Sequence, residues 1–361
     1  MSHRIYESEV EQIALELLRD ENGYTVLFGP DLTEGANPQR VYSEVILPAR
    51  LRAAIERINP HIPAEAREDA YKKALRTQAL TVIDNNEAFH RLLTEGVDVK
   101  FGVGEGKSRT DKVWLVDFAH PDNNEFLAVN QFTVNEGQTN KRPDILLFIN
   151  GLPLVIIELK NAADENADVQ AAFHQLQTYQ QVIPSLFTTN AFLIISDGWF
   201  AKAGTISSDY FRFMEWKSED GVQVVDSKHE PEMAPLIKGL LNKKTLLDVI
   251  HHFIVFEKTK EETVKKVAAY HQYFAVNKAI ASTIRASASE SGRFITEHPA
   301  VYGLPSIEHQ PKGDKRAGVL WHTQGSGKSL SMVFYAGKLV LAPEMNNPTL
   351  VVLTDRNDLD Q

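Results

Sequence analysis

The fold is decided by one stretch, Arg142–Lys160, which reads RPDILLFINGLPLVIIELK. Two runs of β-branched residues and leucine meet in it at Asn150-Gly151. Asn-Gly is the strongest short signal for a β-hairpin, because both turn residues must tolerate a positive φ. We therefore expect two antiparallel strands, Asp144–Ile149 and Leu152–Leu159.

The predicted hairpin gathers charged residues at one edge, because Asp144 opens its first strand and Glu158 and Lys160 close its second. Glu158 and Lys160 are two positions apart, so their side chains share a face. Two carboxylates can hold Mg²⁺, which lowers the pKa of a bound water and neutralises a phosphate under attack. The sequence thus predicts a phosphodiester-cutting site in which Lys160 orients water or stabilises the transition state. The alternative is a surface ion pair, which so apolar a strand disfavours.

Elements around the hairpin are expected to complete a compact α/β unit with a mixed sheet. Helical periodicity predicts helices over about Ser8–Arg19, Pro48–Ile58, Ala64–Thr81 and Asn166–Ile183. Apolar runs bounded by turn residues predict strands over Lys112–Phe118, Glu125–Val134 and Ala191–Ile195.

A second chemistry is indicated by Trp321–Ser329, which reads WHTQGSGKS. The loop that begins at Thr323 is glycine-rich, and it can turn backbone N–H groups toward phosphate at a helix N-terminus. Its residues expected to bind nucleotide phosphate are Thr323, Gly325, Ser326, Gly327 and Lys328, with Ser329 as a Mg²⁺ ligand. A strand Ala317–Trp321, a helix Gly327–Val340 and a strand Thr349–Leu353 would open a nucleotide-binding parallel sheet.

Three regions are expected along the chain: an endonuclease core over 1–205, a peripheral region and connector over 206–250, and the start of a nucleotide-binding domain over 251–361. The middle region is expected because Lys202–Lys244 shows no sustained period, whereas Thr245–Ser287 is predicted to be largely helical.

Composition excludes several classes of protein. The chain of 361 residues has no cysteine, which rules out disulfide frameworks, thiolate metal sites and cysteine nucleophiles. Its net charge of −10 argues against a wholly basic nucleic-acid coat but allows local DNA contacts. No signal peptide is evident, and the longest apolar run is broken by Asn150-Gly151, so we expect a cytoplasmic protein with no membrane span.

Arg142-Pro143-Asp144 followed by Glu158-Leu159-Lys160 resembles the PD-(D/E)xK nuclease signature. In the next helix, Gln175 and Tyr179 resemble the Gln-x-x-x-Tyr element of the RecB-like branch, and their spacing places them on one face, where they could meet a DNA backbone or brace the metal site. That branch often adds a carboxylate from its first helix. Glu11 fits this metal-binding role best and Glu9 second, although acids in a first turn commonly serve the helix dipole.

The glycine-rich loop resembles that of superfamily-two helicases and translocases, which have a RecA-like fold, although His322 stands where the strict loop pattern has glycine. Tyr270–Phe274 is similar to the segment that reads adenine in such motors, which implies ATP as the nucleotide and Gln272 as the reader. A solvent-facing Gln272 on a helix is the alternative. Val351–Leu359 resembles the next motor element, with Arg356 as a DNA phosphate contact.

A RecB-like nuclease followed by a superfamily-two motor resembles the restriction (R) subunit of type I restriction–modification enzymes. The resemblance implies ATP-driven translocation on double-stranded DNA, Mg²⁺-dependent cleavage of unmethylated foreign DNA, and methyltransferase (M) and specificity (S) subunits as partners. No acidic Walker-B strand follows the loop, so we expect an N-terminal fragment that does not hydrolyse ATP alone.

Two other interpretations stay open. A RecBCD- or AddAB-like repair helicase–nuclease usually has its nuclease after the motor, the reverse of the order expected here. A non-catalytic DNA-binding scaffold would be expected to lack Asp144, Glu158 or Lys160, and all three are present.

Overall fold

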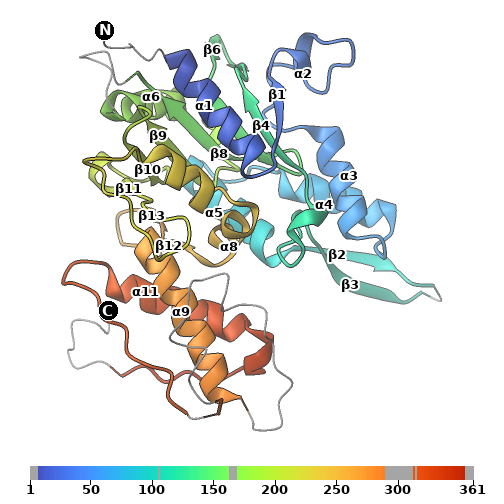
Figure 1. The fold of residues 1–361 in the computed structure, drawn as a ribbon. Helices are drawn as coiled ribbons and strands as arrows, with labels where there is room; N and C mark the ends of the chain where they lie inside the picture. Colours follow the sequence, from blue (N-terminus) through green and yellow to red (C-terminus); the bar gives the residue numbers. More distant parts are fainter. Residues whose placement is uncertain (1–6, 105, 162–168, 289–311, 314, 354–361) are drawn as a thin grey trace. The chain divides into compact units, whose positions relative to one another are not determined.

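The computed structural model describes residues 7–104, 106–161, 169–288, 312–313 and 315–353. The chain forms two compact units (Figure 1). The first contains the residues up to Glu219 together with Gln223–Ala269, and the second contains Asp220–Val222 together with Tyr270–Gln361. The three functional regions expected from the sequence stay a prediction.

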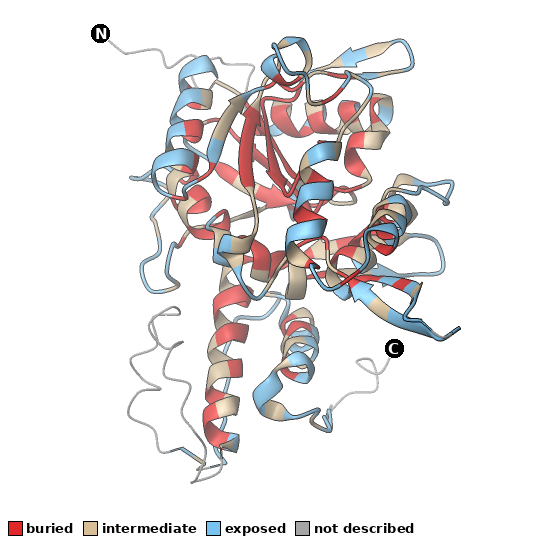
Figure 2. Ribbon diagram, turned by 90° about the vertical axis from the view of Figure 1, so that its right-hand side faces the viewer, coloured by how far each residue is buried: buried red, intermediate tan, exposed pale blue. Residues whose placement is uncertain are grey.

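The first unit is built on a mixed sheet of seven strands in the order β1-β4-β7-β8-β9-β10-β11. Its strands are β1 (Thr25–Phe28), β4 (Phe126–Asn130), β7 (Ile145–Ile149), β8 (Leu152–Leu159), β9 (Phe192–Ser196), β10 (Ala201–Gly204) and β11 (Met214–Glu215). The pairs β1–β4 and β8–β9 are parallel, and the other neighbours are antiparallel. The predicted α/β unit with a mixed sheet is confirmed, and its central strands are buried (Figure 2).

The β7–β8 hairpin turns at Asn150-Gly151, as predicted. Asn150 has φ 53° and Gly151 has φ 82°, so both turn residues are left-handed. A Cβ atom on Gly151 would lie 2.7 Å from the carbonyl oxygen of Leu47, so this turn requires glycine for space as well as for conformation.

The hairpin contains a β-bulge that sets which residues share a face. Ile149 and Phe148 pair with Leu152 and Pro153, but the next residue, Leu147, pairs with Val155. One extra residue, Leu154, is therefore accommodated in β8, next to a proline that has no N–H to donate to the ladder. From there the register is regular up to the pair Ile145 and Ile157.

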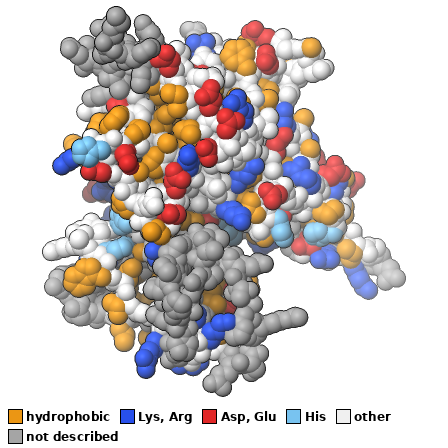
Figure 3. All heavy atoms as spheres, viewed as in Figure 1, with side chains coloured by type: hydrophobic (Ala, Val, Ile, Leu, Met, Phe, Trp, Pro, Cys, Tyr) orange, Lys and Arg blue, Asp and Glu red, His pale blue; other side chains and the backbone are white. Residues whose placement is uncertain are grey.

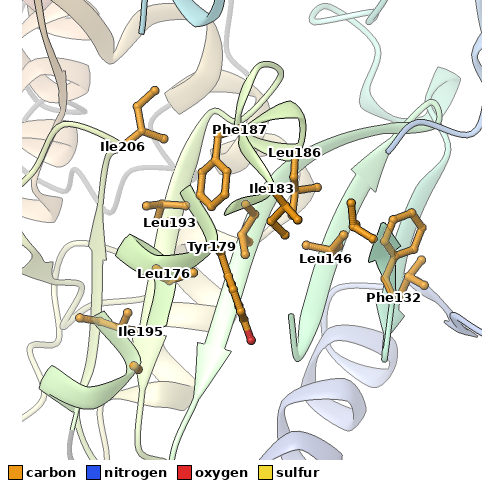
Figure 4. Close-up of a cluster of buried hydrophobic side chains, with 14 of the residues drawn as sticks. Phe132, Leu146, Leu176, Tyr179, Ile183, Leu186, Phe187, Leu193, Ile195 and Ile206 are labelled. Atoms are coloured by element: carbon orange, nitrogen blue, oxygen red, sulfur yellow. The ribbon is translucent and has the colours of Figure 1, made fainter. Parts of the chain in front are cut away.

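Helix α6 (Val169–Val182) covers one face of the sheet. Its buried side chains pack in one core cluster with side chains of β4, β7, β8 and β9 (Figure 4). Members of this cluster include Leu146 of β7, Ile156 of β8, Ile195 of β9 and Leu176 and Tyr179 of α6. The helix predicted over 166–183 is confirmed where the structure describes it, and its first three residues lie outside the described residues.

The remaining helices up to residue 187 are α1 (Glu7–Asp20), α2 (Asp31–Glu34), α3 (Pro48–Ile58), α4 (Ala64–Ala74) and α5 (Val82–Glu95), with the short turns η1 (Pro121–Asn123) and η2 (Pro184–Phe187). The single helix expected over Ala64–Thr81 is wrong. Helix α4 ends at Ala74, and Thr81 instead caps α5 by accepting a hydrogen bond from the N–H of Asp84 at 3.2 Å. A threonine N-cap begins a helix because it satisfies a free N–H of the first turn.

Two predicted strands were misplaced. The strand expected over Lys112–Phe118 is β3 (Ser108–Val113), which pairs with β2 (Val97–Gly102). The strand expected over Glu125–Val134 is split into β4 and β5 (Val134–Glu136), and β5 pairs with β6 (Thr139–Lys141). The split occurs at Gln131, whose φ of 55° is incompatible with a continuous strand.

The region expected to be a peripheral connector, 206–250, contains β11, η3 (Tyr210–Arg212), α7 (Met233–Pro235) and the π-helical turn η4 (Leu236–Leu240), whereas β10 lies just before it. After α8 (Lys243–His252) come β12 (Ile254–Lys258) and β13 (Thr263–Val267), so the largely helical expectation is wrong there. Lys265 of β13 is buried and donates hydrogen bonds to Asn86 Oδ1 and the Asn190 carbonyl oxygen at 2.8 and 2.6 Å. These tertiary contacts explain why helical periodicity was a poor guide.

The second unit pairs α9 (Tyr270–Ser287) with α11 (Lys328–Leu341), which is followed by η6 (Pro343–Met345). Lys338 donates to Asn277 Oδ1 at 2.6 Å between these helices. The strands expected over Ala317–Trp321 and Thr349–Leu353 are not formed in the described part of this unit. Strands require a paired neighbour, and these two segments do not pair with one another.

The surface of the first unit carries charges of both signs, which are interspersed on the face drawn in Figure 3. Within the described part of the chain, each helix is too short or too polar to cross a lipid bilayer.

Candidate active site

The edge of the sheet where β7 begins and β8 ends brings together the three residues singled out in the sequence. Asp144 immediately precedes β7. Glu158 is the second-last residue of β8, and Lys160 comes directly after that strand. The backbone N–H of Leu159 donates to Asp144 Oδ2 at 2.7 Å, which ties the first acid to the segment that carries the other two residues. Leu146 and Ile156 are cross-strand partners in the α6 core, and Asp144 and Glu158 continue that face two residues further on.

Asp144 and Glu158, named here the acidic pair, are both buried, at 9% and 0% exposed. Burial raises the pKa of Asp144 to about 6, the N–H of Leu159 and the charge of Lys160 oppose this increase, and the charges of Glu7 and Glu11 add to it. Burial also raises the pKa of Glu158 well above its usual value, and the charge of Asp144 raises it further. Because the ionisation of these two neighbouring carboxyl groups is unfavourable, binding of a cation is favoured at this site.

Lys160 supplies the positive charge beside the pair. Its Nζ atom lies 3.3 Å from Glu158 Oε1 and 3.7 Å from Glu7 Oε1, and it donates to the Leu159 carbonyl oxygen at 2.8 Å. The contact with Glu7 was missed in the sequence. The signal available was its spacing of four from Glu11, which places both acids on one face of α1.

Gln175 and Tyr179 lie one helical turn apart on α6, where Tyr179 is buried and Gln175 is half-buried. The Gln175 side-chain amide donates to the Tyr179 hydroxyl, which in turn donates to the Arg142 carbonyl oxygen at 3.4 Å. Burial raises the pKa of Tyr179, and the charges of Glu158 and Asp144 add to the increase. Tyr179 therefore contacts the segment that leads to Asp144, and Gln175 contacts Tyr179.

Glu11 is half-buried on α1 and its charge acts on Asp144, whereas Glu9 is exposed. Glu11 Oε1 accepts a hydrogen bond from Asn130 Nδ2 at 2.7 Å, and Glu11 Oε2 accepts one from Gln131 Nε2 at 3.0 Å. Among the described residues, no group of three or more acids or histidines is arranged as a complete metal site. The acidic pair is thus the candidate donor set, and a ligand role for Glu11 stays a prediction.

The second site is the glycine-rich loop Thr323–Ser329 of the other unit. Gly325 and Gly327 have φ 82° and 76°, and Gly327 immediately precedes α11. Both conformations are left-handed, which glycine adopts at little cost. The loop therefore leads into the N-terminus of α11, where free backbone N–H groups favour an anion.

Gln272 is buried, at 3% exposed, and donates to the Gly327 carbonyl oxygen at 3.0 Å. The alternative of a solvent-facing glutamine is wrong, because this side chain holds the glycine-rich loop. A Cβ on Gly327 would lie 2.5 Å from Gln272 Nε2, so the end of that flexible side chain would have to shift. Adenine recognition by Gln272 stays a prediction.

The other loop residues predicted from the sequence lie on the exposed side. Lys328 Nζ donates to the carbonyl oxygens of His322 and Thr323 at 3.2 and 3.0 Å. The Ser326 hydroxyl donates to the Thr323 carbonyl oxygen at 2.8 Å. Ser329 is exposed in the first turn of α11, and Arg356 lies outside the described residues.

Two family descriptions match the chain. Residues 4–210, more than half of the chain, match "Type I restriction enzyme R protein N terminus". Residues 271–361 match "SWI2/SNF2 ATPase". The two matches fall on the segments that carry the acidic pair and the glycine-rich loop.

Curated relatives agree with these matches. The chain is 42% identical, over 98% of its length, to the endonuclease subunit of the type I restriction enzyme HindI from Haemophilus influenzae. It is 34% identical, over 98% of its length, to the putative type I restriction enzyme MjaIXP endonuclease subunit of Methanocaldococcus jannaschii. The chain spans about a third of the length of these relatives, 32% and 33%. The chain belongs to the family of type I restriction enzyme R proteins.

Proposed function

We propose that the first unit is the Mg²⁺-dependent endonuclease module of a type I restriction subunit. The observation that carries the proposal is a buried acidic pair with an ammonium group 3.3 Å from one of its members. The names of the relatives, which are endonuclease subunits, support the same class of reaction.

The acidic pair fits a divalent cation. Glu158 Oε2 is buried and has no hydrogen-bond partner among the described residues, so one carboxylate oxygen is left for another ligand. Carboxylate oxygens are the donors that Mg²⁺ prefers, and water commonly completes its coordination. Asp144 and Glu158 would hold the ion, with Glu11 as a third candidate ligand.

Bound Mg²⁺ would supply an activated water and neutralise charge on the phosphate. Lys160, held by Glu158 and Glu7, would orient that water or stabilise the phosphorane-like charge. The N–H of Leu159 fixes Asp144, and Gln175 and Tyr179 brace the segment from α6, so the acids stay in place while the scissile phosphate binds.

The second unit is proposed to bind ATP through the glycine-rich loop, with Lys328 on the β- and γ-phosphates and Ser329 on Mg²⁺. The match to the SWI2/SNF2 ATPase description supports this. In the whole subunit, together with methyltransferase and specificity subunits, ATP-driven translocation on double-stranded DNA would precede cleavage of unmethylated foreign DNA. Gln272 would read adenine after leaving Gly327, and Arg356 would contact a DNA phosphate.

Two other functions are less well supported. A non-catalytic scaffold has no need for a buried acidic pair, whose ionisation opposes burial. A repair helicase–nuclease would have the same chemistry, but the relatives are restriction subunits.

The proposal is tested by reconstituting the full-length subunit with its methyltransferase and specificity subunits. Asp144→Ala, Glu158→Ala and Lys160→Ala should abolish double-strand cleavage and leave ATP-driven translocation intact, as measured by displacement of a triplex-forming strand. Asp122→Ala, which removes an exposed acid of the same unit, is the control and should cut normally. Cleavage by any of the three site variants would contradict that residue's role.

A further inference from the structure

Each oxygen of the Glu11 carboxylate accepts a hydrogen bond from a side-chain amide at the end of β4. Asn130 Nδ2 donates to one oxygen at 2.7 Å, and Gln131 Nε2 donates to the other at 3.0 Å. Glu11 is separated from the adjacent residues Asn130 and Gln131 by more than a hundred positions in the sequence. Hydrogen bonds from amides to a charged carboxylate are stronger than those between neutral groups.

Gln131 also connects this contact with the acidic pair. Its backbone N–H donates to the Asp144 carbonyl oxygen at 3.1 Å, and its φ is 55°. A left-handed glutamine is uncommon, and such conformations persist where the surrounding structure imposes them. Here one residue binds the Asp144 backbone with its N–H and Glu11 with its side chain.

The turn that presents the two amides is itself fixed by its neighbour. The N–H of Gly29 donates to the Asn130 carbonyl oxygen at 2.8 Å. A Cβ on Gly29 would lie 2.6 Å from the Gln131 carbonyl oxygen, so glycine is required for this close approach. The amides therefore project from a rigid support.

The arrangement opposes a repulsion. The charge of Glu11 contributes to raising the pKa of Asp144, so the two carboxylates repel each other. The two amides each use one lone pair of a Glu11 oxygen, and a carboxylate has further lone pairs for another partner.

We propose that Asn130 and Gln131 are positioning residues that form an amide clamp, which holds Glu11 toward the cation bound by the acidic pair. The clamp rests on the proposed nuclease function and extends it to residues outside the predicted motif. Outer hydrogen bonds of this kind orient metal-binding carboxylates, and their loss typically lowers metal affinity or activity about 10- to 100-fold.

The test measures the Mg²⁺ concentration needed for half-maximal cleavage by the full-length reconstituted enzyme. Asn130→Asp is isosteric but replaces the donor by a like charge, and Asn130→Ala removes the donor without adding charge. Both should raise the Mg²⁺ requirement by about 10- to 100-fold and leave translocation unchanged. Gln12→Glu is the matched control, because Gln12 donates to Glu16 at 2.7 Å on the exposed side of the same helix, and it should have no effect.

The rival explanation is that the contact only fastens α1 to β4. A double variant that exchanges the carboxylate and the amide distinguishes the two explanations. Glu11→Gln combined with Asn130→Asp re-forms an amide–carboxylate contact but moves the charge off α1. A contact that only fastens the two elements would be restored in this double variant, with a wild-type Mg²⁺ requirement, and that result would overturn the proposal. We expect the requirement to stay raised although the thermal unfolding temperature recovers.

Failure of the clamp is distinguishable from failure of the nuclease assignment. If Asp144→Ala and Glu158→Ala abolish cleavage while Asn130→Asp and Asn130→Ala keep the wild-type Mg²⁺ requirement, only the clamp is wrong. If the Asp144 and Glu158 variants still cut DNA, the assignment of the site is wrong.

Discussion

The two candidate sites are built in opposite ways. The acidic pair consists of buried side chains whose positions depend on strand register, on α1 and on α6. The glycine-rich loop consists of consecutive residues whose exposed backbone leads into one helix. The first attracts a cation because burial and mutual repulsion make its charges unfavourable, and the second attracts an anion because N–H groups at a helix start have no partners. The difference teaches that a cation site depends on tertiary structure, whereas a phosphate loop can be specified locally.

The largest expected effects compare the two lysines. Lys328→Ala should abolish translocation and, as a consequence, cleavage, because the loop loses its charge on the nucleotide phosphates. Lys160→Ala should abolish detectable cleavage, a loss of about 1,000-fold or more, equivalent to at least about 4 kcal/mol, with translocation unchanged. Triplex displacement and plasmid cleavage, measured on the same preparations, check both. If Lys160→Ala stopped translocation, the two sites would not be separable.

The acid site should depend on pH in a way that the loop does not. Burial raises the pKa of Asp144 to about 6, and a metal ion requires the ionised form. Mg²⁺ affinity should therefore fall about tenfold for each pH unit below about 6, as one proton competes with the ion. Calorimetric titration of the full-length subunit between pH 5 and 8 measures this. A pH-independent affinity would mean that Asp144 does not ligate the ion.

The raised pKa of Asp144 also predicts how the stability of the metal-free protein depends on pH. The folded-state pKa of Asp144 is raised above its ordinary value of 3.8, so the folded protein binds the proton more tightly and loses stability as pH rises from about 4 to about 6. Asp144→Asn removes this penalty and should stabilise the metal-free protein by about 1–3 kcal/mol at pH 7. Urea unfolding with a chelator should show the two proteins converging below pH 4. A gap that persisted there would point to another cause.

The smallest effect compares two glycines with the same φ. Gly151 and Gly325 both have φ 82°, but a Cβ on Gly151 meets the Leu47 carbonyl oxygen at 2.7 Å, whereas one on Gly325 meets nothing within 4 Å. Gly325→Ala should cost about 1 kcal/mol locally for the left-handed conformation, and Gly151→Ala about 1 kcal/mol more. Hydrogen exchange at each site measures the difference. Equal costs would show that the hairpin can relax around the added methyl group.

Local signals were read correctly because they depend on neighbours in the sequence. The Asn150-Gly151 turn and the start of α11 after Gly327 are examples, since a positive φ and a helix start need only a few adjacent residues. The strands expected at 317–321 and 349–353 were wrong because a strand depends on a partner that local sequence does not supply.

By itself the sequence determined that Asp144 and Lys160 would lie at one edge of a hairpin, because a two-residue turn makes its strands antiparallel. Only the tertiary structure decided which way Glu158 faces. Without the bulge at Leu154, regular pairing would place Asp144 opposite Ile157, and Glu158 would point to the other face of the sheet. Pro153 was a signal for that bulge, but its position in the register, and the amides that hold Glu11, depend on packing between residues far apart in the chain.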